Sequence, residues 1–417
     1  MRKVILHNFS IPYARSASGF FNIDQSGIFF AEKGDFVVTR QRPPEAFLQY
    51  LETLGYDFKG LQFIWPKKSL AEDSQSIFED TYVKTSMKSL VQNSSVPSIL
   101  DSFMLTESEA LWAKDIGVGY IGDPSHYHLF GNKSYFRTFM KKKGFLIPRG
   151  FSNQRGKIDG AIKSALLFLS GATEVVVKQD EGVAGLGSRK FSKQELLTYG
   201  TVSQELFPSP NELGVLPTHS DRFVVEKWYQ NVVCSPSIQL YVDFSGEVSI
   251  ISVHVQNFYS NNMSYAGCSS EDWLENQVAK RIREEGRSII KELATKGFRG
   301  HCALNAIVLD NTKIMWVELN PRRVISSYPF QIIQRVCDNT VHEVSYLTVS
   351  IYKERWKGKT VAEILKELDP ILYTPSAYCG VILMHYHFLE SLGEITLLCV
   401  GRNREEVKHV SRGAHAM

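Results

Sequence analysis

Short apolar runs alternate with stretches of helical periodicity over roughly the first 125 residues. In residues 44–54 the apolar side chains Phe47, Leu48, Leu51 and Leu54 share one helical face, which predicts an amphipathic helix. Such alternation of strands and helices is typical of a small doubly wound domain. The predicted strands are residues 4–6, 27–30, 36–38 and 61–64, a second helix covers 107–116, and connections cover 89–98 and 117–124.

The pattern changes from about residue 126, where longer strand patterns surround one long helical segment. Residues 133–143 predict a helix that ends at Gly144, with Pro148 shortly beyond. A long amphipathic helix is predicted over 272–296, with its inward side chains at Trp273, Val278, Ile282, Ile289 and Leu293. The remaining predictions are a helix at 161–169, strands at 174–178, 223–227, 238–244, 248–255, 302–309 and 313–320, and a small α/β terminus at 346–417 with strands at 381–387 and 395–400.

Composition narrows the classes of function. The 47 Lys and Arg residues against 44 Asp and Glu leave a net charge of +3, too even for a protein that binds nucleic-acid phosphates through a basic face. The longest apolar stretches have only strand length, which predicts no membrane span. Only three apolar residues precede His7, too few for a signal peptide, and the six cysteines form no CxxC pair. We therefore expect a cytoplasmic protein with no nucleic-acid or membrane partner.

Two segments combine a lysine with backbone suited to phosphate. Lys133 opens the first helix of the second half, although a lone lysine there is more simply explained as a solvated side chain. Lys178 ends an apolar strand, and Gly182, Gly185 and Gly187 follow it closely. The backbone N–H groups of such a loop can approach phosphate oxygens without obstruction by side chains. Taken alone, the loop is somewhat more simply explained as a mobile surface connection.

The segment after the long helix predicts a β-hairpin that turns at Asn311. A two-residue loop pairs Asp310 with Lys313 and, counted back along both strands, places Asn305 opposite Glu318. The plainer alternative is that Asn305 only forms a hydrogen bond across the hairpin.

Polar side chains alternate with apolar ones on the second strand of this hairpin. Glu318 and Asn320 share one face with the opposing asparagine, while Val317 and Leu319 are predicted to point into the core. Three oxygen donors followed by Arg322 suit a hard cation that bridges phosphates. Glu-x-Asn-Pro-Arg alone is commonly just a strand end and a turn.

Taken in order, these segments resemble the ATP-grasp superfamily over roughly residues 125–330. The matching segments are Lys133 with Gly-Phe-Leu-Ile-Pro at 144–148, Lys178 before the glycine-rich loop, Val-Val-Glu-Lys-Trp-Tyr at 224–229, Gly-Phe-Arg-Gly at 297–300, and Glu-Leu-Asn-Pro-Arg at 318–322. The resemblance implies an α/β (α+β) chain with a doubly wound pre-ATP-grasp domain at 1–125. A small ATP-grasp subdomain carrying the glycine-rich loop would follow at 126–220, and a large subdomain with a C-terminal α/β extension at 221–417.

The resemblance also implies a role for each matched residue. ATP would be bound by Lys133, Lys178, Gly182, Gly185, Gly187, Ser188 and an adenine hinge of Glu226, Lys227, Trp228 and Tyr229. Mg²⁺, or Mn²⁺ in its place, would be held by Glu318, Asn320 and Asn305. The catalytic residues would be Lys178 and Arg322, the latter steadying the transferred phosphoryl group. Two positions depart from the pattern: Asn305 is neutral where many members carry a carboxylate, and Ser237 stands where a carboxylate commonly holds the ribose.

The implied activity is a Mg-ATP-dependent ligase that joins a carboxylate to an amine through an acyl phosphate and releases ADP and phosphate. The Glu-Lys-Trp-Tyr hinge and the Asn-Pro-Arg end look most like stand-alone amino-acid or peptide ligases. A carboxylase would need a biotin partner or an attachment site, and the chain has no Ala-Met-Lys-Met sequence. The expected partners are a small carboxylate and a small amine, and a homodimer is left open. Two alternatives stand beside this interpretation: a small-molecule kinase on the same fold, and a non-catalytic nucleotide-binding protein, which the neutral Asn305 allows.

Overall fold

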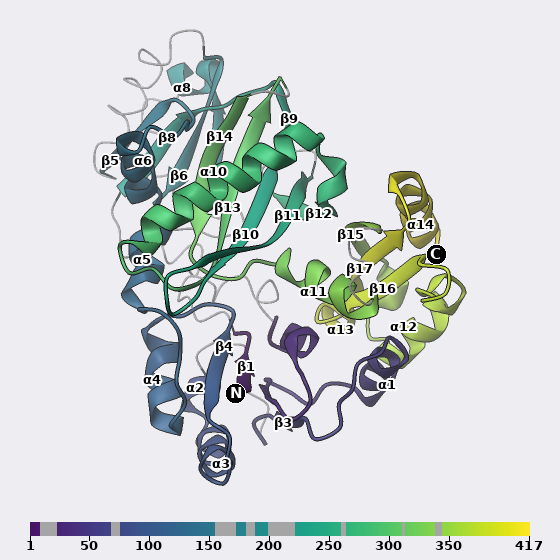
Figure 1. Cartoon of the computed structure of the whole chain (residues 1–417). Helices are drawn as coiled ribbons and strands as arrows, with labels where there is room; N and C mark the ends of the chain where they lie inside the picture. Colours follow the sequence, from purple (N-terminus) through teal and green to yellow (C-terminus); the bar gives the residue numbers. More distant parts are fainter. Residues whose placement is uncertain are drawn as a thin grey trace. The chain divides into compact units, whose positions relative to one another are not determined.

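The structure is a computed structural model that describes residues 1–8, 23–67, 76–154, 172–180, 188–198, 222–259, 264–310, 313–337 and 344–417 (Figure 1). These residues form two compact units. Unit 1 comprises Met1–Pro124, Ala266–Trp273 and Arg323–Met417, and unit 2 comprises Ser125–Tyr265 and Leu274–Arg322. The three-part division expected from the sequence attached the C-terminal segment to the large subdomain instead, and it stays a prediction.

Unit 1 begins with a four-stranded parallel sheet in the order β3-β2-β1-β4. Helix α4 begins with a capping box between Thr106 and Glu109 and ends at Gly117, whose φ of 78° is left-handed. These signals explain why the sequence predicted its bounds correctly. The elements are β1 (Arg2–Leu6), β2 (Phe36–Val38), α1 (Glu45–Thr53), β3 (Gln62–Ile64), α2 (Ser76–Glu79), α3 (Thr81–Gln92), β4 (Ser98–Ser102) and α4 (Glu107–Ile116).

Two predictions in this region were wrong. Residues 27–30, predicted as a strand, belong to the 3-10 helix η2 (Asp24–Phe30), because both edges of β1 are already paired and the whole segment is buried. A short buried apolar run cannot be assigned by periodicity alone. The predicted connection at 89–98 is shorter, because Leu90 and Val91 pack on the core as the last turn of α3.

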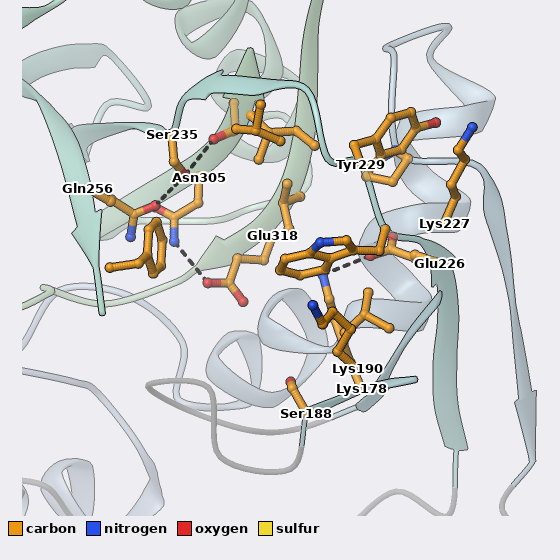
Figure 2. Close-up of a pocket in the computed structure, with 18 of the residues that line it drawn as sticks. Lys178, Ser188, Lys190, Glu226, Lys227, Tyr229, Ser235, Gln256, Asn305 and Glu318 are labelled. Atoms are coloured by element: carbon orange, nitrogen blue, oxygen red, sulfur yellow. Dashed lines mark hydrogen bonds and ion pairs between the residues drawn. The ribbon is translucent and has the colours of Figure 1, made fainter. Parts of the chain in front are cut away.

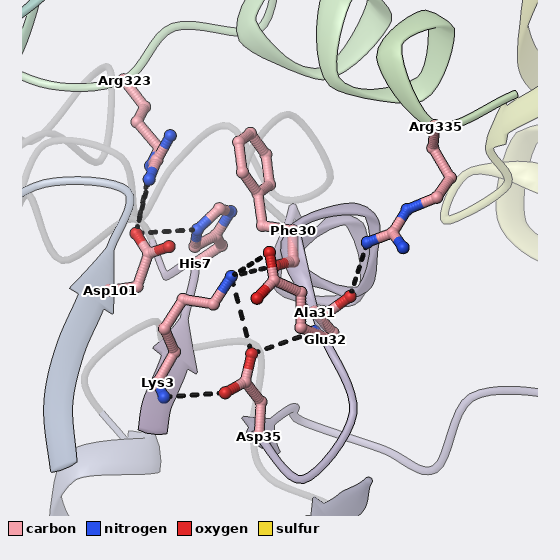
Figure 3. Close-up of polar contacts among 9 residues, drawn as sticks. All are labelled: Lys3, His7, Phe30, Ala31, Glu32, Asp35, Asp101, Arg323 and Arg335. Atoms are coloured by element: carbon pink, nitrogen blue, oxygen red, sulfur yellow. Dashed lines mark hydrogen bonds and ion pairs between the residues drawn. The ribbon is translucent and has the colours of Figure 1, made fainter. Parts of the chain in front are cut away.

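Polar contacts join β1 to the chain that follows η2 (Figure 3). The Lys3 ammonium donates to the Phe30 carbonyl at 2.7 Å and lies 3.6 Å from Asp35, whose carboxylate also accepts the Lys3 backbone N–H at 2.8 Å. At the end of the strand, buried His7 lies 3.9 Å from Asp101, which accepts a 2.7 Å bond from Arg323. Burial lowers the pKa of His7 despite the nearby carboxylate. The contacts of Lys3 hold the segment around Phe30 and Asp35 against the parallel sheet.

The C-terminal part of unit 1 contains an antiparallel set of strands in the order β12-β15-β17-β16. The predicted strands at 381–387 and 395–400 are confirmed in place, with adjusted ends. The elements are β12 (Tyr265–Ser270), η4 (Glu271–Trp273), α11 (Ser327–Val336), β15 (Ser345–Tyr352), η6 (Glu354–Trp356), α12 (Val361–Leu368), η7 (Asp369–Ile371), β16 (Gly380–His385), α13 (Leu389–Leu392), β17 (Glu394–Gly401) and α14 (Arg404–Ala416).

Unit 2 contains a small antiparallel sheet in the order β5-β8-β6-β7. A side chain at Gly150 would meet the Val225 carbonyl at 2.2 Å, so this position requires glycine for β5 and β8 to approach. The predicted helix at 161–169 lies outside the described residues. The elements are α5 (Ser125–Gly131), α6 (Lys133–Lys142), β5 (Gly150–Gln154), β6 (Glu174–Gln179), β7 (Ser188–Ser192), α8 (Lys193–Thr198) and β8 (Arg222–Lys227).

A larger antiparallel group in unit 2 follows the order β14-β13-β10-β11, and β9 also pairs with β13. The long helix α10 (Asn276–Ala294) packs on β10 and β11 (Figure 1), where Gly286 allows close approach to Ile238. Its predicted inward face is confirmed except at Trp273, which lies in η4 before the helix begins. The strands are β9 (Val232–Cys234), β10 (Pro236–Val242), β11 (Val248–Phe258), β13 (Gly300–Leu309) and β14 (Lys313–Asn320).

The predicted hairpin register was wrong at the turn and correct at the functional end. Lys313 pairs with Leu309 rather than with Asp310, so the loop is one residue longer than assumed. A β-bulge then shifts the register back by one, and Asn305 pairs with Glu318 as predicted. Val317 is the extra residue at this bulge, and it lines a pocket instead of entering the core as expected.

No helix in these described ranges is long and apolar enough to cross a membrane.

Candidate functional site

A pocket of about 690 Å³ in unit 2 is lined by residues from both of its sheets (Figure 2). This volume falls in the usual range for small-molecule sites. The predicted site residues that line it are Lys133, Lys178, Ser188, Glu226, Lys227, Trp228, Tyr229, Asn305, Glu318 and Asn320. Gly182, Gly185 and Gly187 lie outside the described residues. The fold therefore brings together side chains that are far apart in the chain.

One wall of the pocket carries a buried group of charges. Lys178 on β6 lies 2.7 Å from the Glu226 carboxylate on β8, and the other oxygen of Glu226 accepts a bond from Arg137 on α6. Glu226 is 2% exposed, whereas the Lys178 side chain remains 15% exposed on the pocket side. The register of β6 against β8 places these two residues on one face of the sheet, in pairs that are two positions apart along the strands.

The start of α6 is fixed by Asp180, the residue that follows β6. The Asp180 carboxylate accepts the Ser134 backbone N–H and the Asn132 side-chain amide, both at 2.6 Å. A carboxylate at a helix N-terminus also stabilises the helix dipole. This arrangement delivers Lys133 to the pocket, where it is only 7% exposed. Burial lowers the pKa of Lys133, with the charge of Lys178 acting in the same direction and that of Glu318 opposing it.

The predicted adenine hinge leaves β8 along the pocket edge. The backbone N–H groups of Lys227 and Trp228 already donate to the carbonyls of Arg149 at 2.8 Å and Glu174 at 3.1 Å. The side chain of Trp228 faces the ammonium of Lys190, which lies 5.4 Å from the indole ring. These residues offer a flat aromatic surface with a cation beside it, suited to stacking a base.

The opposite wall carries the predicted metal site. The Asn305 side-chain N–H donates to Glu318 at 2.8 Å, and Asn320 approaches the same carboxylate oxygen at 3.5 Å. Arg322 in turn donates to the Asn320 side-chain oxygen at 3.0 Å. Burial tends to raise the pKa of Glu318, but Lys133, Lys178 and the Asn305 hydrogen bond outweigh it and leave the pKa lowered. Glu318 is therefore an anion at neutral pH.

The residues on this wall fit a single hard cation. Among the described residues, no group of three or more His, Cys, Asp and Glu side chains is placed to hold a metal ion. What the wall offers is one carboxylate, Glu318, and the amide oxygens of Asn305 and Asn320. The Asn305 side-chain oxygen is buried without a hydrogen-bond partner. Oxygen donors of this kind suit Mg²⁺, which fills its remaining positions with water and phosphate oxygens.

Two residues that line the pocket, Lys190 and Ser235, were missed in the sequence interpretation, whereas Gln256 had been considered for substrate contact. Lys190 follows Ser188 by two on β7, so simple alternation could have placed both on the pocket face. Ser235 and Gln256 also line the pocket and are 3.2 Å apart, whereas Ser237, expected near the ribose, is buried outside the lining. No sequence pattern indicates that Ser235 lines the pocket in place of Ser237, because this depends on how β9 leads into β10.

Comparison with known proteins agrees with this architecture. Residues 25–118 match the pre ATP-grasp domain family. No curated protein matches the chain in sequence. Among solved structures, an ADP complex of N5-carboxyaminoimidazole ribonucleotide synthetase superposes with a TM-score of 0.59 at 11% identity, covering 99% of this chain and 96% of the other.

Two further structures superpose comparably. The biotin carboxylase–β,γ-ATP complex from Campylobacter jejuni has a TM-score of 0.61 at 14% identity, and the match covers 97% of this chain and 89% of the other. The third structure is the biotin carboxylase domain dimer of Hydrogenobacter thermophilus 2-oxoglutarate carboxylase in complex with MgADP, ADP and bicarbonate. It has a TM-score of 0.59 at 14% identity, and the match covers 99% of this chain and 89% of the other. The chain thus has an N-terminal parallel-sheet pre-ATP-grasp domain followed by an ATP-grasp fold. At these identities the likeness describes the fold alone.

Proposed function

We propose that the protein is an ATP-dependent enzyme that activates a carboxylate as an acyl phosphate and transfers the acyl group to an amine. The observation that carries this proposal is the placement of Lys133 and Lys178 in one pocket with Glu318 and Asn320. The lysines supply charge for phosphate oxygens, and the facing wall supplies oxygen donors for a cation. The aromatic edge at Trp228 supplies a stacking surface for the base.

The residues would act mainly by charge neutralisation and alignment. Lys133 and Lys178 would hold the phosphate oxygens of ATP. Arg322 is buried and does not line the pocket, and it would orient the transferred phosphoryl group through its hydrogen bond to Asn320, which does. Glu318, with Asn320 and Asn305, would hold Mg²⁺, which neutralises phosphate charge when it is bound. No protein nucleophile is required in this scheme.

Both chemical steps balance without a further reactant. A carboxylate oxygen of the acceptor attacks the γ-phosphorus, the bond to the β-phosphate oxygen breaks, and ADP leaves with the acyl phosphate retained. The amine nitrogen then attacks the acyl carbon, the tetrahedral intermediate expels phosphate, and the nitrogen loses a proton to solvent. The products are an amide, ADP and phosphate.

The structural neighbours broaden the range of carboxylates to consider. One of them is described with bicarbonate, and others are carboxyaminoimidazole ribonucleotide synthetases. Bicarbonate would react by the same two steps, with carboxyphosphate as the acyl phosphate. The amino-acid or peptide ligase suggested by the sequence pattern and a carboxylating enzyme are therefore two substrate choices for one mechanism.

The deciding experiment is a turnover assay with Mg-ATP and a panel of carboxylates, including amino acids and bicarbonate, each paired with amines. Release of ADP and phosphate in equal amounts, with a coupled product seen by mass spectrometry, supports the ligase. ADP together with a phosphorylated substrate and no free phosphate indicates the kinase alternative. Nucleotide binding without turnover on any pair indicates the non-catalytic alternative.

A further inference from the structure

Arg137 lies behind the pocket wall rather than on it. It is 3% exposed on α6, and one end of its guanidinium donates to the Glu226 carboxylate and to the Pro148 carbonyl at 3.2 Å. Its other guanidinium nitrogens have no hydrogen-bond partner among the described residues, where Glu226 is its only acidic contact. Glu226 and Lys178 line the pocket. Arg137 therefore contacts the pocket wall at two points, the Glu226 carboxylate and the Pro148 carbonyl, and of these only Glu226 carries a charge.

Glu226 is shared between two cations. One carboxylate oxygen accepts from Arg137, and the other lies 2.7 Å from the Lys178 ammonium. The group thus has two positive charges and one negative charge, and the excess positive charge faces the pocket at Lys178. If Arg137 were absent, the single negative charge would be left to Lys178 alone, and the pair would be neutral toward an incoming anion.

The backbone of β5 packs closely against Glu226. Gly150 lies so close that an added Cβ would fall 3.1 Å from the Glu226 Cγ and 2.9 Å from its Cα. Glu226 itself pairs with Val176 on one side and with Gly150 on the other in the sheet register. The carboxylate lies in this tight packing with one cation on each of its oxygens.

We propose that Arg137 is a positioning residue for phosphate binding: by sharing Glu226, it keeps the charge of Lys178 available to the nucleotide. This inference rests on the proposed function and adds a residue that does not touch the ligand. A purely structural arginine would support all ligands equally. A charge-sharing arginine supports ligands that carry phosphate and leaves the binding of the nucleoside nearly unchanged.

The first test compares the binding of ADP and adenosine by calorimetry. Arg137→Met should weaken the affinity for ADP at least 10-fold and the affinity for adenosine less than 2-fold. The double variant Arg137→Met/Glu226→Gln should bind ADP at least 5-fold more tightly than Arg137→Met, because Gln does not neutralise Lys178. Arg281→Met, which removes an arginine from an i,i+4 pair with Glu285 on α10, is the matched control and should change neither ligand. Equal losses for both ligands, or no recovery in the double variant, would overturn the proposal.

A second test needs no nucleotide and therefore separates this proposal from the proposed function. Lys178→Met should lower the Tm by at least 3 °C more in the Arg137→Met background than in the wild type, because Lys178 is then the only remaining partner of Glu226. If the Tm shifts of Arg137→Met and Lys178→Met are additive, the two cations do not share Glu226 and the proposal is wrong. If Arg137→Met does not fold, the double variant with Glu226→Gln should fold because the buried carboxylate is removed together with the guanidinium, and the charge that remains, Lys178, faces the pocket. Its failure to fold would also count against the proposal. A wild type that binds no ADP refutes the proposed function instead.

Discussion

The substitution Asn305→Asp tests the predicted metal site at Glu318 without the need for an identified substrate. Asn305 is 9% exposed and donates to Glu318 at 2.8 Å, so an isosteric aspartate places a second carboxylate against the first. An amide donor is thereby replaced by a group that repels its neighbour. The change restores the number of acidic ligands that the ATP-grasp pattern commonly carries.

The cost follows from the geometry. Two unit charges about 4 Å apart repel by about 4 kcal/mol at an effective dielectric constant near 20. Proton uptake by the new aspartate limits the cost, since raising its pKa from about 3.9 to 7 also requires about 4 kcal/mol. The cations Lys133 and Lys178 reduce the repulsion. We therefore expect Asn305→Asp to destabilise metal-free unit 2 by about 2–4 kcal/mol at pH 7, which lowers Tm by at least ~4 °C.

Divalent cation should reverse this loss. Mg²⁺ at about 100 times its Kd would return about 2.7 kcal/mol by binding the folded state alone. The assay is thermal unfolding with and without Mg²⁺, followed by an Mg²⁺ titration of activity, where the variant should saturate at lower concentration. Asn305→Leu should lose stability without rescue. Asn231→Asp, which creates a similar acidic pair with Asp310 at the surface, should cost less than about 1 kcal/mol. Superimposable Mg²⁺ curves for wild type and Asn305→Asp would show that Asn305 is not at a metal site.

Three further predictions follow from the same structure. Lys133→Met should weaken ATP use about 10-fold or more while the protein stays folded, because a charged hydrogen bond of about 1.5–3 kcal/mol is lost; unchanged turnover would remove its phosphate role. Chromatography of a turnover mixture should show ADP and no AMP, and stoichiometric AMP would exclude attack at the γ-phosphorus. Burial lowers the pKa of His254 and of His385 to about 3, so both stay neutral when folded, and the stability that they contribute is complete above pH ~6.5 and is lost as the pH falls toward 3. Each histidine should therefore lower the free energy of unfolding by about 2 kcal/mol at pH 5. If the denaturant midpoint of His385→Gln falls with pH as steeply as that of the wild type, this prediction is wrong.

Local signals predicted the elements whose ends are encoded by nearby residues. The cap at Thr106 and the left-handed Gly117 define α4, and alternation defines the long strands of unit 2. Residues 27–30 were assigned wrongly because a short buried run fits a strand and a 3-10 helix equally well. The choice depends on β1 having no free edge, which is a property of the whole sheet.

The candidate site shows the same division between local and distant information. Asn305 was placed opposite Glu318 from a turn that proved one residue too short, and an unpredicted bulge at Val317 corrected the count. Lys178 and Glu226 were each singled out, but their contact depends on the pairing of β6 with β8. Arg137 gave no signal at all, because a buried arginine in an amphipathic helix is visible only once its partner is known.

Calorimetric titration of ADP into wild type and Lys178→Met decides whether the unit 2 pocket binds the phosphates of ATP through Lys178. A lost charged hydrogen bond of about 1.5–3 kcal/mol corresponds to roughly a 10- to 150-fold weaker Kd. Lys190→Met, which removes a charge from the same pocket where Glu174 already pairs with it at 3.1 Å, should have a clearly smaller effect. We expect tight ADP binding by the wild type and a loss specific to Lys178→Met. Equal ADP affinity in wild type and folded Lys178→Met would contradict the account.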